Sequence, residues 1–95
     1  MEIMINNKFK YKVLKNYNDA IDVALLNEKI TDYFSDFDYI VGDWAYGKLR
    51  LKGFTKRDNK HYKMINSFDT VEKYILEYCA YGCKHFILEK IEVEK

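Results

Sequence analysis

The sequence predicts a small α+β domain, in which a mainly antiparallel mixed sheet carries two helices. Short segments with alternating apolar and polar residues predict strands, and two longer segments with apolar residues at helical spacing predict helices. The segments follow in the order ββ-α-βββ-α-β, which favours local hairpins over the crossovers of a doubly wound parallel sheet. The chain has 95 residues, of which 48% are hydrophobic. Residues 1–95 are therefore expected to form one domain with its own core.

A hairpin is expected at the start of the chain. Residues 3–5 are apolar, and Asn6 and Asn7 favour a turn because asparagine tolerates the left-handed backbone conformation. In residues 9–14, aromatic and aliphatic side chains alternate with lysines, which is the period of a half-buried strand.

The first helix is expected between residues 23 and 37. Apolar residues recur there at helical spacing and polar residues occupy the other face, as in an amphipathic helix of three to four turns. The helix should end near Ser35 and Asp36. Its start is ambiguous, because three residues are suitable caps: Asn18, Asp19 and Asp22.

Three strands are expected in the middle of the chain. Residues 39–41 are apolar, and the segment from Gly42 to Gly47 breaks this strand, because two glycines indicate positive φ or a close backbone approach. Residues 48–52 alternate strictly between basic and apolar side chains. After a polar loop, residues 62–65 are the expected return strand.

A second helix and a last strand complete the predicted domain. Either Ser67 or Asp69 caps the helix, whose apolar residues lie between residues 68 and 79 at helical spacing. Gly82 is a natural stop after the helix. Residues 85–91 contain an apolar run that predicts the final strand.

Charge is balanced overall but unevenly distributed along the chain. The net charge of +1 excludes a globally basic nucleic-acid binder, yet residues 21–45 carry a net charge of −5 and residues 46–66 carry +6. No apolar run approaches the ~18 residues of a membrane span. The first residues also lack the basic start of a signal peptide. We therefore expect a cytoplasmic protein that does not bind a membrane.

Two stretches of the chain resemble the YutD-like family, small proteins of low-GC Gram-positive bacteria. Residues 38–54 (DYIVGDWAYGKLRLKGF) are similar to the family's central motif, and residues 74–89 (YILEYCAYGCKHFILE) are similar to its C-terminal motif. The resemblance implies a cytosolic α+β domain. It implies no activity, and no catalytic residue is carried over from it.

The basic block predicts a ligand-binding surface. Cations should project from one face of the strand over residues 48–52, with aromatic rings close by in the sequence. Cations neutralise phosphates and rings stack on bases, so RNA or single-stranded DNA is one candidate ligand, and an acidic protein surface is another. The candidate residues are Trp44, Tyr46, Lys48, Arg50, Lys52, Lys56, Arg57 and Tyr62. Alternatively, the cations are only the solvated side of a half-buried strand, with Trp44 in the core.

Two cysteines and two histidines are the candidate metal ligands: Cys79, Cys83, His61 and His85. A structural zinc site usually combines two closely spaced pairs, whereas this chain has one Cys pair. The C-x₃-C spacing also differs from the C-x-x-C redox motif. We expect no metal and no cofactor, and small buried thiols, while a reversible disulfide remains open.

Acidic residues cluster around the first central strand, at Asp36, Asp38 and Asp43. Asp43 is either a partly buried general acid or base, or a side chain that fixes a turn by accepting backbone N–H bonds. The second interpretation is favoured. The sequence contains no nucleophile elbow, phosphate-binding glycine-rich loop or H-E-x-x-H motif.

Tyrosines give the second helix an aromatic stripe. Tyr74, Tyr78 and Tyr81 are spaced i, i+4, i+7, which suits either a docking face or the edge of a core. The sequence therefore favours a binding or regulatory module that engages a polyanion through its basic strand. An adaptor that docks through the Tyr-rich helix is the alternative, and a small enzyme is the least favoured class.

Overall fold

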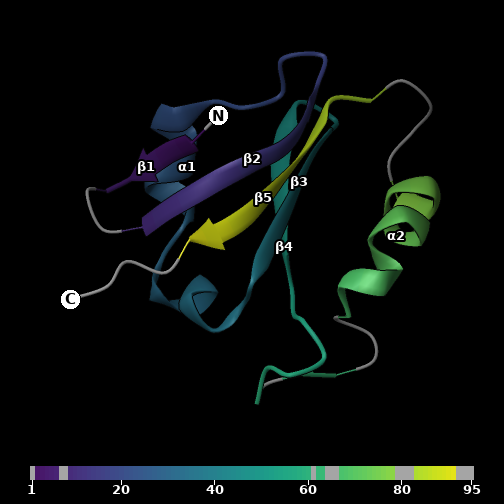
Figure 1. Ribbon diagram of the computed structural model, residues 1–95. Helices are drawn as coiled ribbons and strands as arrows, with labels where there is room; N and C mark the ends of the chain where they lie inside the picture. Colours follow the sequence, from purple (N-terminus) through teal and green to yellow (C-terminus); the bar gives the residue numbers. More distant parts are fainter. Residues whose placement is uncertain (1, 7–8, 61, 64–66, 79–82, 92–95) are drawn as a thin grey trace.

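The protein folds as a five-stranded antiparallel sheet with one α-helix on each face (Figure 1). This computed structural model describes the chain except residues 1, 7–8, 61, 64–66, 79–82 and 92–95. The strand order is β1-β2-β5-β3-β4. The elements are β1 (Glu2–Ile5), β2 (Phe9–Tyr17), α1 (Val23–Lys29), β3 (Tyr39–Ala45), β4 (Lys48–Phe54), α2 (Val71–Tyr78) and β5 (His85–Ile91). The α+β expectation is confirmed.

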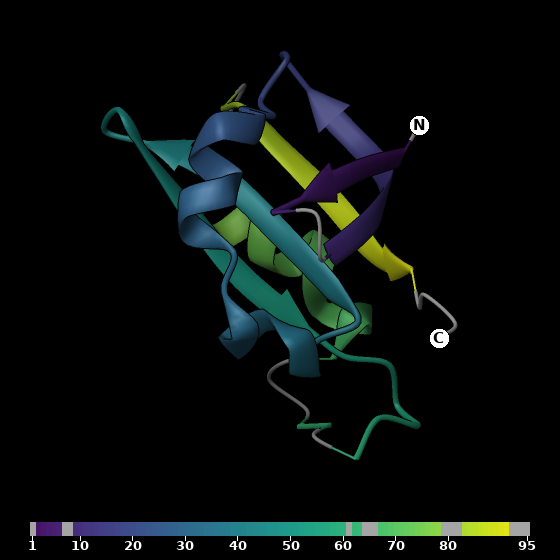
Figure 2. The ribbon, with the colours of Figure 1, turned by 90° about the vertical axis from the view of Figure 1, so that its left-hand side faces the viewer.

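The sheet buries side chains on both faces, because α1 and α2 cover opposite sides of its central strands (Figure 2). On the α1 side, the core includes Tyr11, Leu26, Ile40, Phe86 and Leu88. On the α2 side, a smaller core contains Tyr39, Val41, Phe54 and Val71. Apolar burial on both faces is the main favourable contribution to folding.

The N-terminal hairpin forms as expected, but the first helix is shorter than expected. Asn6 has a φ of 56° in the turn, and Asp22 caps α1 by accepting a hydrogen bond from the Leu25 N–H at 3.1 Å. The helix ends at Lys29, because Ile30 adopts extended ψ and is fully buried in the core. A separate 3₁₀ helix, η1, follows at Asp32–Asp36. The apolar periodicity over residues 23–37 therefore belongs to two helical segments.

The first central strand is longer than expected. Residues 42–45 were expected to break it, yet β3 continues to Ala45. Gly42 lies within the strand because the ring of Phe86, its partner in β5, occupies the space that a Cβ would need. The turn consists of Tyr46 and Gly47, with φ of 54° and 73°. Gly42 thus provides the close approach and Gly47 the positive φ that the two glycines predicted.

The expected return strand is wrong at Tyr62 and Lys63, which belong to no strand, while residues 64 and 65 lie outside the described residues. Instead, Thr55 forms an isolated parallel bridge with Ser67. Ser67 also caps the 3₁₀ turn η3 (Phe68–Thr70) before α2, accepting from the Asp69 N–H at 3.3 Å. Within the described ranges, no helix is long and apolar enough to cross a membrane.

Candidate basic surface on strand β4

The cations of β4 share one side of the sheet. Lys48, Arg50 and Lys52 project on the side of α2, whereas Leu49 and Leu51 pack into the core on the side of α1. The alternation in the sequence thus predicted the strand and its two faces. It did not show that a helix partly covers the basic side.

Arg50 is paired with a buried carboxylate on the neighbouring strand. Its guanidinium donates to Oδ2 of Asp43, which is 1% exposed, and this hydrogen bond raises the pKa of Arg50. Asp43 lies directly opposite Arg50 in the β3–β4 register, within a strand rather than in a turn. The expected turn-fixing role of Asp43 is therefore wrong: it compensates a cation across the sheet.

Lys52 lies against aromatic rings rather than standing free. Its Nζ is 4.9 Å from the ring centroid of Tyr74 and 5.4 Å from that of Phe54. Tyr74 packs edge-on against Phe54 with centroids 5.6 Å apart, and both rings belong to the α2-side core. Tyr74 is thus part of the core edge. The side chain of Tyr78 and all of Tyr81 lie outside the described residues.

Trp44 lies on the opposite side of the sheet from the three cations. It packs against the α1-side core, and its Nε1 donates to the carbonyl oxygen of Ala20 at 2.8 Å. The structure therefore does not bring Trp44 together with the basic side of β4.

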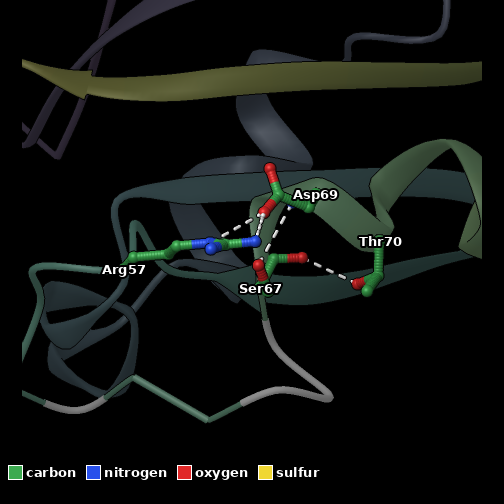
Figure 3. A network of polar contacts seen from close by, with 4 residues as sticks. All are labelled: Arg57, Ser67, Asp69 and Thr70. Carbon is green, nitrogen blue, oxygen red and sulfur yellow. Dashed lines mark hydrogen bonds and ion pairs between the residues drawn. The ribbon is translucent and has the colours of Figure 1, made fainter.

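The loop after β4 is held by acidic residues. Oδ2 of Asp38 accepts hydrogen bonds from the Lys56 N–H at 2.8 Å and from the Asn59 side chain at 3.0 Å. Arg57 forms an ion pair with Asp69 at 2.9 Å, which joins the loop to the segment that precedes α2 (Figure 3). This anchoring role of Asp38 was not predicted, because it depends on a loop conformation that the sequence pattern does not reveal.

The remaining candidates lie at opposite ends of β4. Tyr46 and Lys48 are at the β3–β4 turn, whereas Lys56, Arg57 and the half-buried Tyr62 follow the other end of the strand. Seven strand residues span roughly 20 Å. The predicted residues thus form an elongated edge and not one compact pocket.

Tyr46 is fully exposed at the β3–β4 turn. Its exposed fraction is 102%, and its φ of 54° lies in the left-handed region. Lys48, the first residue of β4, is exposed beside it. Positive φ at a tyrosine was not predictable from local propensity, because that region favours Gly and Asn.

The cysteine and histidine prediction is only partly within the described residues. The expectation of a small buried thiol is wrong at Cys83, which is disulfide-bonded and half-buried. Nδ1 of the buried His85 lies 3.0 Å from the Cys83 carbonyl oxygen. Cys79 and His61 lie outside the described residues. In the described part of the chain, no three His, Cys, Asp or Glu side chains form a potential metal site.

Comparisons with known proteins agree with one another. The family model described as "Putative antitoxin YutD-like" matches residues 5–89. The Bacillus subtilis protein "Putative antitoxin YutD" is 37% identical over 89 residues, which cover 94% of this chain and 97% of that protein. The solution NMR structure of protein yutD from B. subtilis matches with a TM-score of 0.78 and 35% identity, and covers 100% of this chain and 86% of that chain.

Proposed function

The chain belongs to the YutD-like family, and both the family and its B. subtilis member are described as a "Putative antitoxin". We propose that the chain is a binding module for a partner protein. An antitoxin counteracts a toxin, and a protein can do so by docking on it. The docking surface in this proposal is the basic edge, which we define as the side chains of Lys48, Arg50 and Lys52 with the open edge of β4. Its partner would present an acidic surface.

The observation that carries the proposal is the position of β4 in the sheet. Among the described strands, β4 pairs only with β3, so its other edge is open. An open edge can pair with an extended segment of another protein through main-chain hydrogen bonds. Lysines on such an edge discourage indiscriminate pairing, whereas carboxylates on a partner complement them. The charge of the edge therefore favours an acidic segment.

The same geometry favours a protein over a nucleic acid. Single-stranded nucleic acid needs rings and cations on one platform. Here Trp44 packs on the other side of the sheet from the cations of β4, so this ring and the cations do not share a platform. An adaptor role through the helix tyrosines has less support, because Tyr74 packs against Phe54 in the core.

The test begins with the tagged wild-type chain, which is used to capture a protein from an extract of its own organism. The captured protein is purified, and its affinity for the wild-type chain and its variants is measured by titration. Lys48→Glu should weaken binding of this protein by about three- to tenfold at low salt, because a rim charge changes sign. Lys29→Glu is the matched control, since Lys29 is exposed on α1 across the sheet, and it should leave the affinity unchanged.

Two results would contradict this function. The first is the absence of any captured protein, and the second is equal affinity for wild type and Lys48→Glu. A parallel anisotropy titration with mixed-sequence single-stranded oligonucleotides at low salt separates the two ligand classes. Binding of the oligonucleotides that Lys48→Glu abolishes would favour a nucleic-acid ligand instead.

A further inference from the structure

We propose that Tyr46 is the anchor residue of the interface, and that its ring inserts into an apolar pocket on the partner protein, rimmed by carboxylates that face Lys48. This inference rests on the proposed function and names the residue that would dominate the binding energy. It derives from three features of the β3–β4 turn: exposure, backbone conformation and rigid support.

The first feature is the complete exposure of a large ring. Tyr46 is 102% exposed, so its side chain gains nothing from burial in the fold. An isolated exposed apolar residue is common and carries no inference alone. Tyrosine is, however, among the residues that most often dominate protein–protein interfaces, because its ring buries large area at a small entropic cost.

The second feature is the backbone conformation of Tyr46. A two-residue turn with positive φ at both positions strongly prefers Asn-Gly, because only Gly, Asn and Asp adopt this region readily. Here Tyr46 has a φ of 54° before Gly47 at 73°. Unfavourable backbone conformations persist where the surrounding structure compensates for them, and they concentrate at functional sites. Burial of the Tyr46 ring does not offset the cost of this backbone conformation, because the ring is exposed. A binding role outside the fold therefore explains the tyrosine best.

The third feature is the rigid base under the turn. The backbone N–H of Trp44 donates to the carbonyl oxygen of Lys84 at 3.0 Å, while its indole binds Ala20. These bonds join the hairpin to the start of β5 and to the loop that follows β2. The backbone that carries the ring is therefore fixed, which lowers the backbone entropy lost on binding. A projecting ring requires a concave partner surface.

The charges beside the turn define the rim of that pocket. Lys48 is exposed directly after Gly47, and Arg50 follows on the same side of the strand. Carboxylates around an apolar pocket would complement Lys48 while the pocket takes the ring of Tyr46. The same acidic surface would then continue along the basic edge.

The experiment uses the captured protein defined above, purified and titrated by calorimetry. Tyr46→Asn should raise its Kd at least tenfold, because the ring is lost while the turn is kept. Tyr46→Phe retains the ring and should stay within about fivefold of wild type. Leu76→Ala is the matched control, since Leu76 is an exposed apolar residue on α2 (83%), and it should change Kd less than twofold.

The outcomes separate this inference from the proposed function. If Tyr46→Asn binds within twofold of wild type while Lys48→Glu binds weakly, the anchor role is overturned and the proposed function stands. If wild type captures no protein, both fail together. The thermal midpoint of Tyr46→Asn should equal or exceed that of wild type. A lower midpoint would show that Tyr46 has a structural role, and would also overturn the inference.

Discussion

At the scale of single residues, the pair Asp43–Arg50 shows how a buried carboxylate is tolerated inside the sheet. Asp43 is almost inaccessible to solvent, while the side chain of Arg50 remains 43% exposed. Oδ1 of Asp43 has no hydrogen-bond partner among the described residues, so the arginine is the main compensation of its charge. Removing one partner of such a pair leaves an uncompensated charge.

We therefore expect Arg50→Ala to lower the free energy of unfolding, because it leaves the buried Asp43 carboxylate uncompensated, but by less than for a fully buried pair because solvent screens Arg50. The double variant Asp43→Asn, Arg50→Ala should recover part of this loss. Urea unfolding at pH 7 measures both. If Arg50→Ala is as stable as wild type, the carboxylate is not stabilised by the guanidinium.

Residue-level prediction from the sequence succeeded where chemistry is local. The two glycines around residues 42–47 indicated a close approach and a positive φ, and both are present. It was unsuccessful for Asp43, because the partner of a strand residue depends on register between strands. No local pattern encodes that Asp43 lies opposite Arg50.

At the scale of elements, the central hairpin depends on the contact between Gly42 of β3 and Phe86 of β5. A methyl group at residue 42 would overlap this ring, which is itself fully buried. We expect Gly42→Ala to destabilise the fold by about 1–3 kcal/mol, the typical cost of overpacking.

Chemical unfolding of Gly42→Ala alone and together with Phe86→Leu checks this contact. The second substitution removes the overlapping ring atoms, so the double variant should lose less stability than the sum of the two single variants. Additive losses would mean that the two residues do not conflict.

Element boundaries could be predicted only in part. The strands over residues 3–5, 48–52 and 85–91 follow from apolar runs and alternation, which are local patterns. The first helix ends early because Ile30 leaves the helix to enter the core, a tertiary effect. Likewise, alternation identified the basic side of β4 but not that α2 packs beside it.

At the scale of the whole molecule, the acidic and basic blocks of the sequence become neighbours. Asp43 and Asp38 belong to the acidic block, and they contact Arg50 and the backbone of Lys56 in the basic block. The net charges of the two blocks therefore overstate the free positive charge at the candidate site. Charge along a sequence predicts a surface only after pairing across the sheet is known.

Alkaline pH tests the burial of two tyrosines in the core. Burial raises the pKa of Tyr11 to about 12, and burial together with Glu89 and Asp38 raises that of Tyr39 to about 12. Both pKa values exceed the usual 10.0, so the folded state keeps these hydroxyls protonated more readily than the unfolded state does. Their contribution to the free energy of unfolding is therefore complete below pH 10 and is lost as the pH rises toward 12.

Tyr11→Phe isolates one of these contributions. The Tyr11 hydroxyl has no hydrogen-bond partner among the described residues, so the variant should be at least as stable as wild type at pH 7. Between pH 10 and 12 it should lose about 2 kcal/mol less than wild type. Urea unfolding across this pH range measures the difference. If the free energy of unfolding falls in parallel with pH for the two proteins, the burial of Tyr11 is contradicted.

The central claim is that Tyr46 in the β3–β4 turn serves binding, although it lowers the stability of the fold. Its most direct test is Tyr46→Asn, measured for both affinity and stability. We expect the affinity for the captured protein to fall at least tenfold, while the free energy of unfolding rises by about 1 kcal/mol because Asn adopts positive φ more readily. Either unchanged affinity or lower stability would contradict the claim.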